Sequence, residues 1–153
     1  EVAVETARTA KVFGMEPKVA MLSYSTKGSG KGSGVDLVRE ATAIAKEKAP
    51  DVAIDGEMQV NFAFNRELRD EKYPFTRLRG LDVNTLIFPN LTSANSSYKM
   101  IKGMSDDCEV IGPIQMGLNK PIHFTDFESS VRDIVNITAV AVIDAIVLEK
   151  KWQ

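Results

Sequence analysis

An apolar run that breaks abruptly into glycine, serine and lysine constrains the fold of this chain most. Residues 19–24 are apolar enough to predict a buried strand, and residues 25–34 contain four glycines. Apolar residues then recur at helical spacing over 35–48, and Pro50 marks the end of that predicted helix. A strand, a glycine-rich loop and a helix in this order predict a βα unit whose loop can approach a ligand closely.

The loop has features that suit an anion. Its glycines let backbone N–H groups turn toward a ligand, and Lys27 and Lys31 add positive charge. The N-terminus of the following helix adds a partial positive charge of its own. We therefore expect an anion at this loop, and the alternative is a solvated turn of glycine and serine.

Two common phosphate-binding signatures do not fit the loop. A P-loop requires Gly and a Ser or Thr at the positions that hold Ser25 and Gly32, respectively. The dinucleotide-binding pattern requires glycine where the chain has Ser33 or Val35. The stretch is therefore neither a Walker loop nor a Rossmann fingerprint.

Composition limits the class of protein. The 153 residues are 44% hydrophobic with a net charge of −2, which predicts a single domain over 1–153 and argues against nucleic acid as a main partner. The lone Cys108 excludes an internal disulfide, and one Cys with one His excludes the usual zinc clusters, so no metal site is expected. We find no signal peptide and no membrane span, and expect a cytoplasmic protein without a membrane partner. A helix that is already under way at residue 2 indicates a fragment of a longer chain.

Predicted strands alternate with predicted helices along the chain. The strands are expected at 19–24, 52–54 and 84–89, with short apolar runs at 110–113 and 121–124, and the helices at 2–13, 35–48, 58–71, 90–104 and 130–149. This alternation predicts an α/β fold with a mainly parallel sheet and helices on both faces. Ligands gather at the carboxyl ends of such strands, where 23–34, 55–57 and 89–90 are expected to lie.

Charged residues outside the loop allow two interpretations each. Asp55 and Glu57 flank a glycine at a predicted strand-to-helix corner, where paired carboxylates can position a substrate or act as acid and base. The alternative is that Asp55 caps the helix and Glu57 lies in its first turn.

The basic residues between 66 and 79 are expected to form a solvated face, and the apolar final helix is expected to be buried on more than one side.

Several separate motifs are similar to one known family. They occupy residues 22–29, 55–59, 86–90 with 97–99, and 111–121. In their residues and spacing they resemble the phosphate acetyl/butyryl transferases over nearly the whole chain. The resemblance implies the C-terminal half of a two-domain α/β subunit, with an architecture like that of isocitrate and isopropylmalate dehydrogenases. It also implies acetyl transfer between phosphate and coenzyme A, with the ligands in the cleft between the two domains.

The chain departs from this family at a Ser-Arg pair. Alignment on residues 120–121 and 131–135 places Asp133 at the family's Asp, Asp126 at the Ser position and Phe127 at the Arg position. A second family arginine corresponds to Lys102. By the resemblance, the Ser and Asp assist the coenzyme A thiol and the Arg holds phosphate. Each unit of charge is worth about 3 kcal/mol at roughly 5 Å and an effective dielectric near 20, so the change disfavours a phosphate dianion. We therefore expect no transferase activity from this chain.

A transferase-like domain with this altered pair resembles the C-terminal region of large bacterial NADP-dependent malic enzymes. Segments 121–123 and 130–136 are also more similar to that branch. The resemblance implies a regulatory and assembly domain that senses acetyl-coenzyme A, attached to a malic enzyme that oxidatively decarboxylates malate to pyruvate. NADP and a divalent metal are then expected in the N-terminal malic enzyme domain of the same chain. No cofactor is expected in this domain. The protein is expected to be a homo-oligomer.

Two alternatives remain. One is an active phosphate acetyltransferase in which Asp126 or Ser129, together with Asp133, handles the thiol proton. The other is a purely structural dimerisation module. The residues expected to bind acetyl-coenzyme A or coenzyme A are Ser25, Thr26, Lys27, Gly28, Ser29 and Lys102. His123 is expected to be structural.

Overall fold

The computed structural model describes residues 1–104 and 109–151, so Cys108 and the interpretation placed on it lie outside the described residues. The chain divides into two compact units, Glu1–Tyr98 and Lys99–Gln153. Each unit is described by itself. The expectation of one domain over 1–153 stays a prediction.

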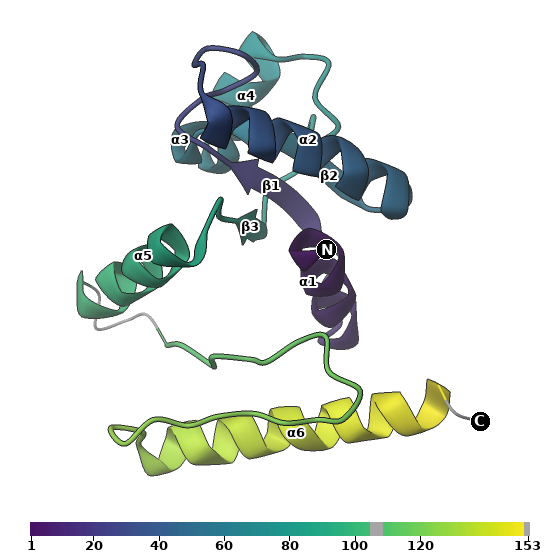
Figure 1. The fold of residues 1–153 in the computed structure, drawn as a ribbon, viewed down its shortest axis with the longest axis vertical. Coiled ribbons are helices and arrows are strands. Elements are labelled where there is room, and N and C mark those ends of the chain that lie inside the picture. Colours follow the sequence, from purple (N-terminus) through teal and green to yellow (C-terminus); the bar gives the residue numbers. More distant parts are fainter. Residues whose placement is uncertain (105–108, 152–153) are drawn as a thin grey trace. The chain divides into compact units, whose positions relative to one another are not determined.

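A parallel sheet forms the centre of the first unit (Figure 1). Its strands are β1 (Lys18–Leu22), β2 (Ala53–Met58) and β3 (Thr85–Ile87), and the order in the sheet is β2-β1-β3. The helices of this unit are α1 (Val2–Val12), α2 (Ser33–Lys48), α3 (Val60–Phe64) and α4 (Arg66–Lys72). The α/β fold and the parallel sheet predicted from the sequence are confirmed.

Other elements cover both faces of the sheet. Successive side chains of a strand point to opposite faces, so they enter two different cores. Val19 and Met21 of β1 belong to one core, which also contains apolar residues of α1 and α2. Ala20 and Leu22 belong to a second core on the other face, with Met58 and residues from α3 and the segment after α4. Continuous apolar sequence in β1 therefore reflects burial on both sides.

Several predicted boundaries differ from the observed ones. The strand expected over 19–24 ends at Leu22, and the helix expected at 35 begins at Ser33. The helix expected over 58–71 is two helices, because the side chain of Asn65 accepts a hydrogen bond from the Leu68 N–H and starts α4 afresh.

The corner predicted around Asp55 and Glu57 is part of strand β2 instead. The interpretation of Asp55 as a helix cap is wrong, because α3 begins only at Val60. Met21 pairs with Gly56 and Leu22 pairs with Met58, which leaves Glu57 as the extra residue of a β-bulge. A bulge changes the direction in which a side chain points, and here it does so at the carboxyl end of the sheet.

Arg69 is the exception to the predicted solvated basic face, since Arg66, Lys72, Arg77 and Arg79 are exposed. Its side chain is buried and donates hydrogen bonds to the carbonyls of Ala63 at 3.0 Å and Leu78 at 3.0 Å, and also to those of Phe62 and Leu81. The segment between α4 and β3 has little regular structure, so its carbonyls need donors from side chains. Arg69 supplies them, and charge patterning alone does not reveal this role.

The second unit is dominated by one helix. Helix α5 (Leu91–Met104) crosses the division between the units, and α6 (Val131–Lys151) ends the described chain. Within α6, Ile137 and Val140 are buried while Val131 and Val135 are exposed, so the helix is not buried on more than one side within this chain. Burial of its exposed apolar side chains in a subunit contact stays a prediction. No helix within residues 1–104 and 109–151 is both long and apolar enough to cross a membrane.

The short apolar runs 110–113 and 121–124, between these helices, form no strand. His123 nevertheless has a structural role, as predicted. Its Nε2 lies 2.8 Å from Oδ2 of Asp144 on α6, and its Nδ1 accepts the N–H of Gln115 at 3.3 Å. The imidazole therefore links an irregular segment to the helix.

Replacement of Gly56 tests how closely β1 and β2 approach. A Cβ atom at this position would lie 2.6 Å from both the Cβ and the carbonyl oxygen of Met21, closer than packed atoms allow. We expect Gly56→Ala to lower the free energy of unfolding by about 1–3 kcal/mol or more, measured by urea denaturation. Gly34→Ala is the control, because nothing lies within 4 Å of a Cβ there. Equal stability of the two variants would contradict the close approach.

Candidate functional site

The glycine-rich loop lies at the carboxyl end of the sheet, between β1 and α2. Five of the predicted ligand-binding residues come together there: Ser25, Thr26, Lys27, Gly28 and Ser29. The Thr26 N–H donates to the Ser29 hydroxyl at 2.9 Å, and the Ser29 N–H donates to the Thr26 carbonyl at 3.1 Å. Lys27 and Gly28 both have positive φ, of 47° and 90°, so the chain reverses tightly between them.

Glu57 lies beneath this loop and accepts hydrogen bonds from it. Its Oε1 accepts the Gly28 N–H at 2.7 Å and the Ser25 hydroxyl at 3.1 Å. The guanidinium of Arg39, on α2, lies 3.3 Å from the same oxygen. The Ser25 hydroxyl in turn accepts the Gly30 N–H at 2.9 Å. Groups that the sequence suggested for a ligand anion are therefore bound by a carboxylate of the protein itself.

Asp55 is the second anion below the loop. Its Oδ1 accepts a hydrogen bond from the Lys27 ammonium at 2.7 Å and also contacts the Lys46 ammonium of α2. Its Oδ2 accepts the Thr76 hydroxyl at 2.6 Å and the Arg77 N–H at 3.1 Å. One buried carboxylate thus connects the loop, α2 and the segment after α4.

Both carboxyl groups are ionised in this environment. Burial of Asp55 favours its neutral form, but the hydrogen bonds from Lys27, Lys46 and Thr76 outweigh burial and hold its pKa well below the usual range. Burial also opposes ionisation of Glu57, and the hydrogen bonds from Arg39, Gly28 and Ser25 lower its pKa nevertheless. The site is therefore a compact set of paired charges rather than a free cationic pocket.

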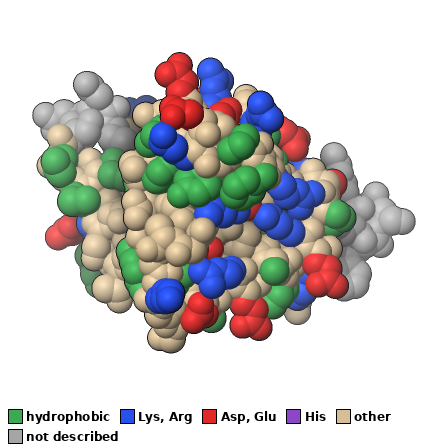
Figure 2. Space-filling model, turned by 90° about the horizontal axis from the view of Figure 1, so that it is seen from above, with side chains coloured by type: hydrophobic (Ala, Val, Ile, Leu, Met, Phe, Trp, Pro, Cys, Tyr) green, Lys and Arg blue, Asp and Glu red, His purple; other side chains and the backbone are tan. Residues whose placement is uncertain are grey.

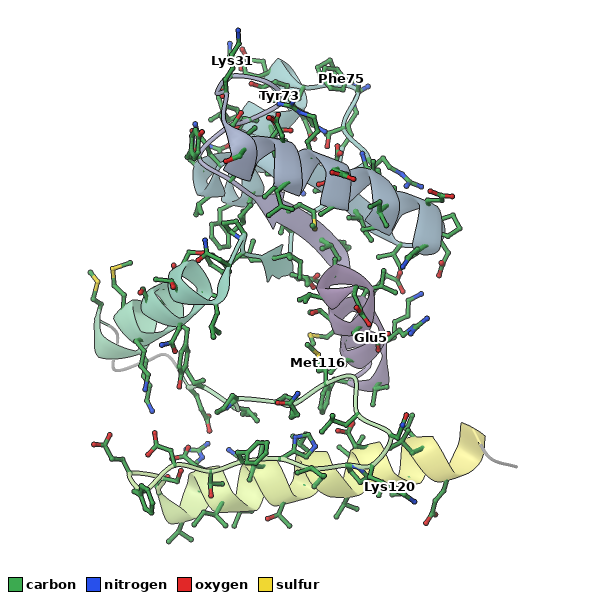
Figure 3. The ribbon with its side chains drawn as sticks, viewed as in Figure 1. Glu5, Lys31, Tyr73, Phe75, Met116 and Lys120 are labelled. Carbon is green, nitrogen blue, oxygen red and sulfur yellow. The ribbon has the colours of Figure 1, made fainter. Side chains whose placement is uncertain are left out.

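Lys27 and Lys31 differ in their surroundings. The Lys27 ammonium also donates to the Gly56 carbonyl at 2.8 Å and lies 6.0 Å from the ring centroid of Phe75. Lys31 is exposed and extends away from the loop (Figure 3). On the face seen in Figure 2, hydrophobic side chains gather in one area, with basic and acidic side chains around it. Lys31 is therefore the more accessible of the two loop cations.

Tyr24 determines the shape of the outer part of the loop. Its hydroxyl donates to the Lys31 carbonyl at 2.8 Å, and its ring lies against the backbone. A Cβ atom on Gly30 would lie 2.9 Å from the ring, and one on Gly32 would lie 2.8 Å from the hydroxyl oxygen. The tyrosine therefore restricts position 30, and the positive φ of 147° at Gly32 favours glycine there independently.

The remaining predicted site residues belong to the second unit: Lys102, Asp126, Ser129 and Asp133. The Asp133 carboxylate accepts the N–H and the hydroxyl of Ser130, each at 2.8 Å, and the Ser130 hydroxyl lies 3.2 Å from the Asp133 N–H. This reciprocal arrangement is a capping box at the start of α6. The Ser130 hydrogen bonds are the main reason that the pKa of Asp133 is lowered, with Lys102 and Arg132 contributing.

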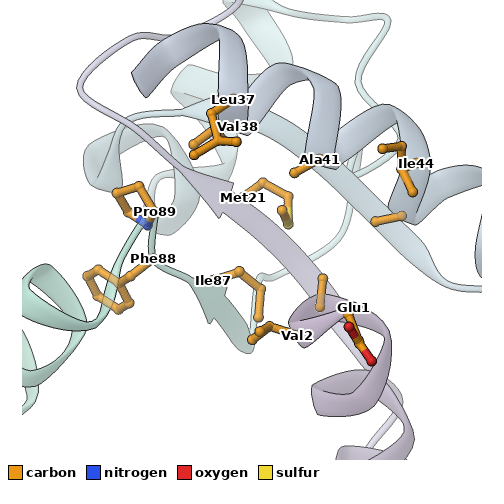
Figure 4. Close-up of a pocket in the computed structure, with 12 residues that line it drawn as sticks. Glu1, Val2, Met21, Leu37, Val38, Ala41, Ile44, Ile87, Phe88 and Pro89 are labelled. Carbon is orange, nitrogen blue, oxygen red and sulfur yellow. The ribbon is translucent and has the colours of Figure 1, made fainter. Parts of the chain in front are cut away.

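An apolar pocket of about 320 Å³ lies elsewhere in the first unit (Figure 4). Residues of α1, α2, β1 and β3 line it, including Val2, Met21, Val38, Ile87 and Pro89. None of the five predicted loop residues lines this pocket. Within residues 1–104 and 109–151, no group of three or more His, Cys, Asp or Glu side chains is placed to hold a metal ion.

Sequence reasoning missed three partners of the two carboxylates: Arg39, Lys46 and Thr76. Arg39 and Lys46 face β2 because the crossover helix of a βα unit packs against the next strand. Their seven-residue separation, two turns of helix, was the available signal. Thr76 lies in an irregular segment that carries no periodic signal.

Comparison with known proteins decides the family. Residues 1–142 match the family model described as phosphate acetyl/butaryl transferase. The chain belongs to this family. The phosphate acetyltransferase of Bacillus subtilis is 40% identical over 146 residues, which are 95% of this chain and 45% of that protein. The NADP-dependent malic enzyme of Salmonella typhimurium is 40% identical over 145 residues, 95% of this chain and 19% of that protein. The chain thus spans less than half the length of either relative, and both resemblances stated from the sequence are confirmed.

Solved structures of the family share the fold. EutD phosphotransacetylase from Staphylococcus aureus has a TM-score of 0.85 at 38% identity, over 97% of this chain and 44% of that one. A phosphotransacetylase from Streptococcus pyogenes has a TM-score of 0.82 at 46% identity, with the same coverage. In this phosphotransacetylase-family chain, the motifs at 22–29, 55–59 and 86–90 all lie at the carboxyl ends of the three strands.

Acid titration tests the role of Asp55. Its pKa is lower in the folded chain than in the unfolded chain, where it is about 3.9, so the stabilisation is complete above that value and is lost as the pH falls. We expect Asp55→Asn to lower the free energy of unfolding at pH 7 by about 3 kcal/mol or more, because two lysines lose their buried partner. As the pH falls below about 5, the free energy of unfolding should also decrease less in the variant than in the parent chain.

The control for this variant is Asp51→Asn. Asp51 pairs with Lys11 at 2.8 Å, but both side chains are largely exposed. Exposed pairs contribute little, so the stability of this variant at pH 7 should remain close to that of the parent chain. If Asp55→Asn behaved in the same way, Asp55 would not be the charge centre of the site.

Proposed function

We propose that the protein transfers an acetyl group between phosphate and coenzyme A, and that this chain forms the C-terminal part of the acting subunit. The observation that carries the proposal, against the expectation of no transferase activity that was based on Asp126 and Phe127, is the family match over residues 1–142. Relatives at 40–44% identity in Bacillus subtilis, Clostridium acetobutylicum and Thermoanaerobacterium thermosaccharolyticum are named phosphate acetyltransferase.

The geometry of the first unit supports binding at the loop that follows β1. The loop is held by hydrogen bonds from Ser25 and Gly28 to Glu57 and from the Gln59 N–H to the Thr26 hydroxyl, so little conformational freedom is lost when a ligand binds. Lys31 places a positive charge on its exposed side. Acetyl phosphate and coenzyme A both carry phosphate groups, for which such a loop at the end of a parallel sheet is suited.

A second candidate is a regulatory domain of an NADP-dependent malic enzyme, which senses acetyl-coenzyme A and assists assembly of a homo-oligomer. The segment around Asp126 favours it. Asp126 and Phe127 are exposed and stand where the family has Ser and Arg, and the Asp126 carboxylate already accepts the Glu128 N–H at 2.8 Å. The lowered pKa of Asp133 makes this carboxylate a weaker base toward a thiol.

In this second candidate the malic enzyme chemistry belongs to another domain of the same chain, where NADP and a divalent metal would bind. The Salmonella typhimurium relative, named NADP-dependent malic enzyme, supports it. A purely structural module remains if neither acetyl transfer nor ligand binding is found.

One pair of assays separates these candidates in the full-length protein. We expect acetyl-coenzyme A to form from acetyl phosphate and coenzyme A, followed by thioester absorbance. If the second candidate holds, this turnover is absent, acetyl-coenzyme A binds in a calorimetric titration, and it changes malate-dependent reduction of NADP by about 5- to 150-fold. Absence of turnover and of binding would reject both.

Restoring the family's Ser-Arg pair provides the matched variant. The double substitution of Asp126→Ser with Phe127→Arg removes one negative charge and adds one positive charge on exposed residues. Each unit of charge is worth about 3 kcal/mol near a phosphate, so turnover should rise by at least about tenfold if this position faces the phosphate. Unchanged turnover would mean that these two residues do not face the reacting groups.

A further inference from the structure

We propose that Glu57 is a positioning residue that sets the shape of the 25–30 loop for ligand binding. This inference rests on the proposed function, because it assigns the loop to the binding of acetyl phosphate or coenzyme A. It concerns a residue that makes no direct contact with the ligand. The claim is that the loop has its binding conformation before a ligand arrives, and that one carboxylate maintains it.

The bulge in β2 accounts for the position of the carboxylate. Glu57 is the extra residue between the pairs Met21–Gly56 and Leu22–Met58. Its backbone carbonyl accepts the Lys27 N–H at 3.1 Å, so main chain and side chain both bind the loop. The side chain is 2% exposed and therefore reaches inward beneath the loop, not into solvent.

The hydrogen-bond directions make the loop geometry specific. An ionised carboxylate only accepts, so the Ser25 hydroxyl must donate to Glu57 at 3.1 Å. The same hydroxyl is then free to accept the Gly30 N–H at 2.9 Å. Gly28 donates directly to Glu57 at 2.7 Å. The amides of Gly28 and Gly30 are therefore both fixed by one carboxylate, the second of them through a buried serine.

The occupied donors also indicate which part of the loop remains for a ligand. The Gly28 amide and the Ser25 hydroxyl point to Glu57, and Lys27 is bound to Asp55. Phosphate groups must therefore be met by the outer side of the loop, where Lys31 is exposed. Glu57 shapes this outer side without touching it.

The variant Glu57→Gln tests the proposal in the full-length protein. An amide keeps the size of the side chain, but its oxygen is an uncharged and therefore weaker acceptor for the Gly28 N–H and the Ser25 hydroxyl. Its NH₂ group cannot accept the Arg39 Nε–H, which Oε2 accepts in the wild type. We expect the KM for one of the two substrates, acetyl phosphate or coenzyme A, to rise about tenfold or more, with kcat changed less than about threefold. The substrate with the raised KM is the one that the loop binds.

Hydrogen exchange provides a readout that does not depend on activity. In Glu57→Gln the amides of Gly28 and Gly30 should exchange at least about tenfold faster, while amides in the centre of α2 are unchanged. Asp36→Asn is the matched control, because Asp36 is the exposed partner of Arg39 at 3.2 Å and leaves every Glu57 contact in place. It should alter neither KM nor the exchange of the two glycine amides.

The outcomes separate the two proposals. If the wild-type protein neither forms nor binds acetyl-coenzyme A, the proposed function fails, and glycine exchange alone decides whether Glu57 sets the loop's shape. If the wild type binds acetyl-coenzyme A without turnover, the dissociation constant replaces KM. An unchanged KM in a folded Glu57→Gln variant, or unchanged glycine exchange, would overturn the inference. A lowered KM would also overturn it, because Glu57 would then compete with the ligand.

Discussion

Two buried carboxylates on one strand hold the functional end of the first unit together. Asp55 binds Lys27 of the loop, Lys46 of α2 and Thr76 of the segment before β3. Glu57 binds the loop and α2 two residues further along. Three chain segments, the loop, α2 and the segment before β3, are thus tied to β2 by charge-assisted hydrogen bonds in surroundings that exclude most water. Without these anions, the lysines and loop amides would lack buried partners, and the loop would have no fixed relation to the sheet.

The fold was largely predictable because its signals are local and repeated. Apolar runs such as 19–22 and helical spacing over 35–48 identify a βα unit in any context. The glycine-rich loop was correctly placed after β1, and the family motifs were recognised from their spacing. Sequence periodicity identified the element types well and their ends less well, since caps such as Asn65 depend on one hydrogen bond.

The candidate site was predictable in its location but not in its internal partners. The sequence pointed to Ser25, Lys27 and Gly28 as ligand contacts, whereas the structure binds each of them to Asp55 or Glu57. The missing information was the register of β2 against β1, because a bulge of one residue decides where Glu57 points. Arg69 illustrates the same point: its burial depends in part on the carbonyls of Leu78 and Leu81, in an irregular segment that no periodicity describes.

Tyr24 bears on why the loop has glycine at positions 30 and 32. Its ring occupies the space that side chains at positions 30 and 32 would need, and its hydroxyl is bound to the carbonyl between them. Glycine at position 30 is thus favoured by an aromatic neighbour as well as by the Ser25 Cβ, which a Cβ atom there would approach to 3.2 Å. At position 32 the backbone φ of 147° favours glycine whatever residue stands at 24. The two glycines therefore answer to different constraints: a smaller residue at 24 would relax position 30 in part and would leave position 32 restricted by its backbone.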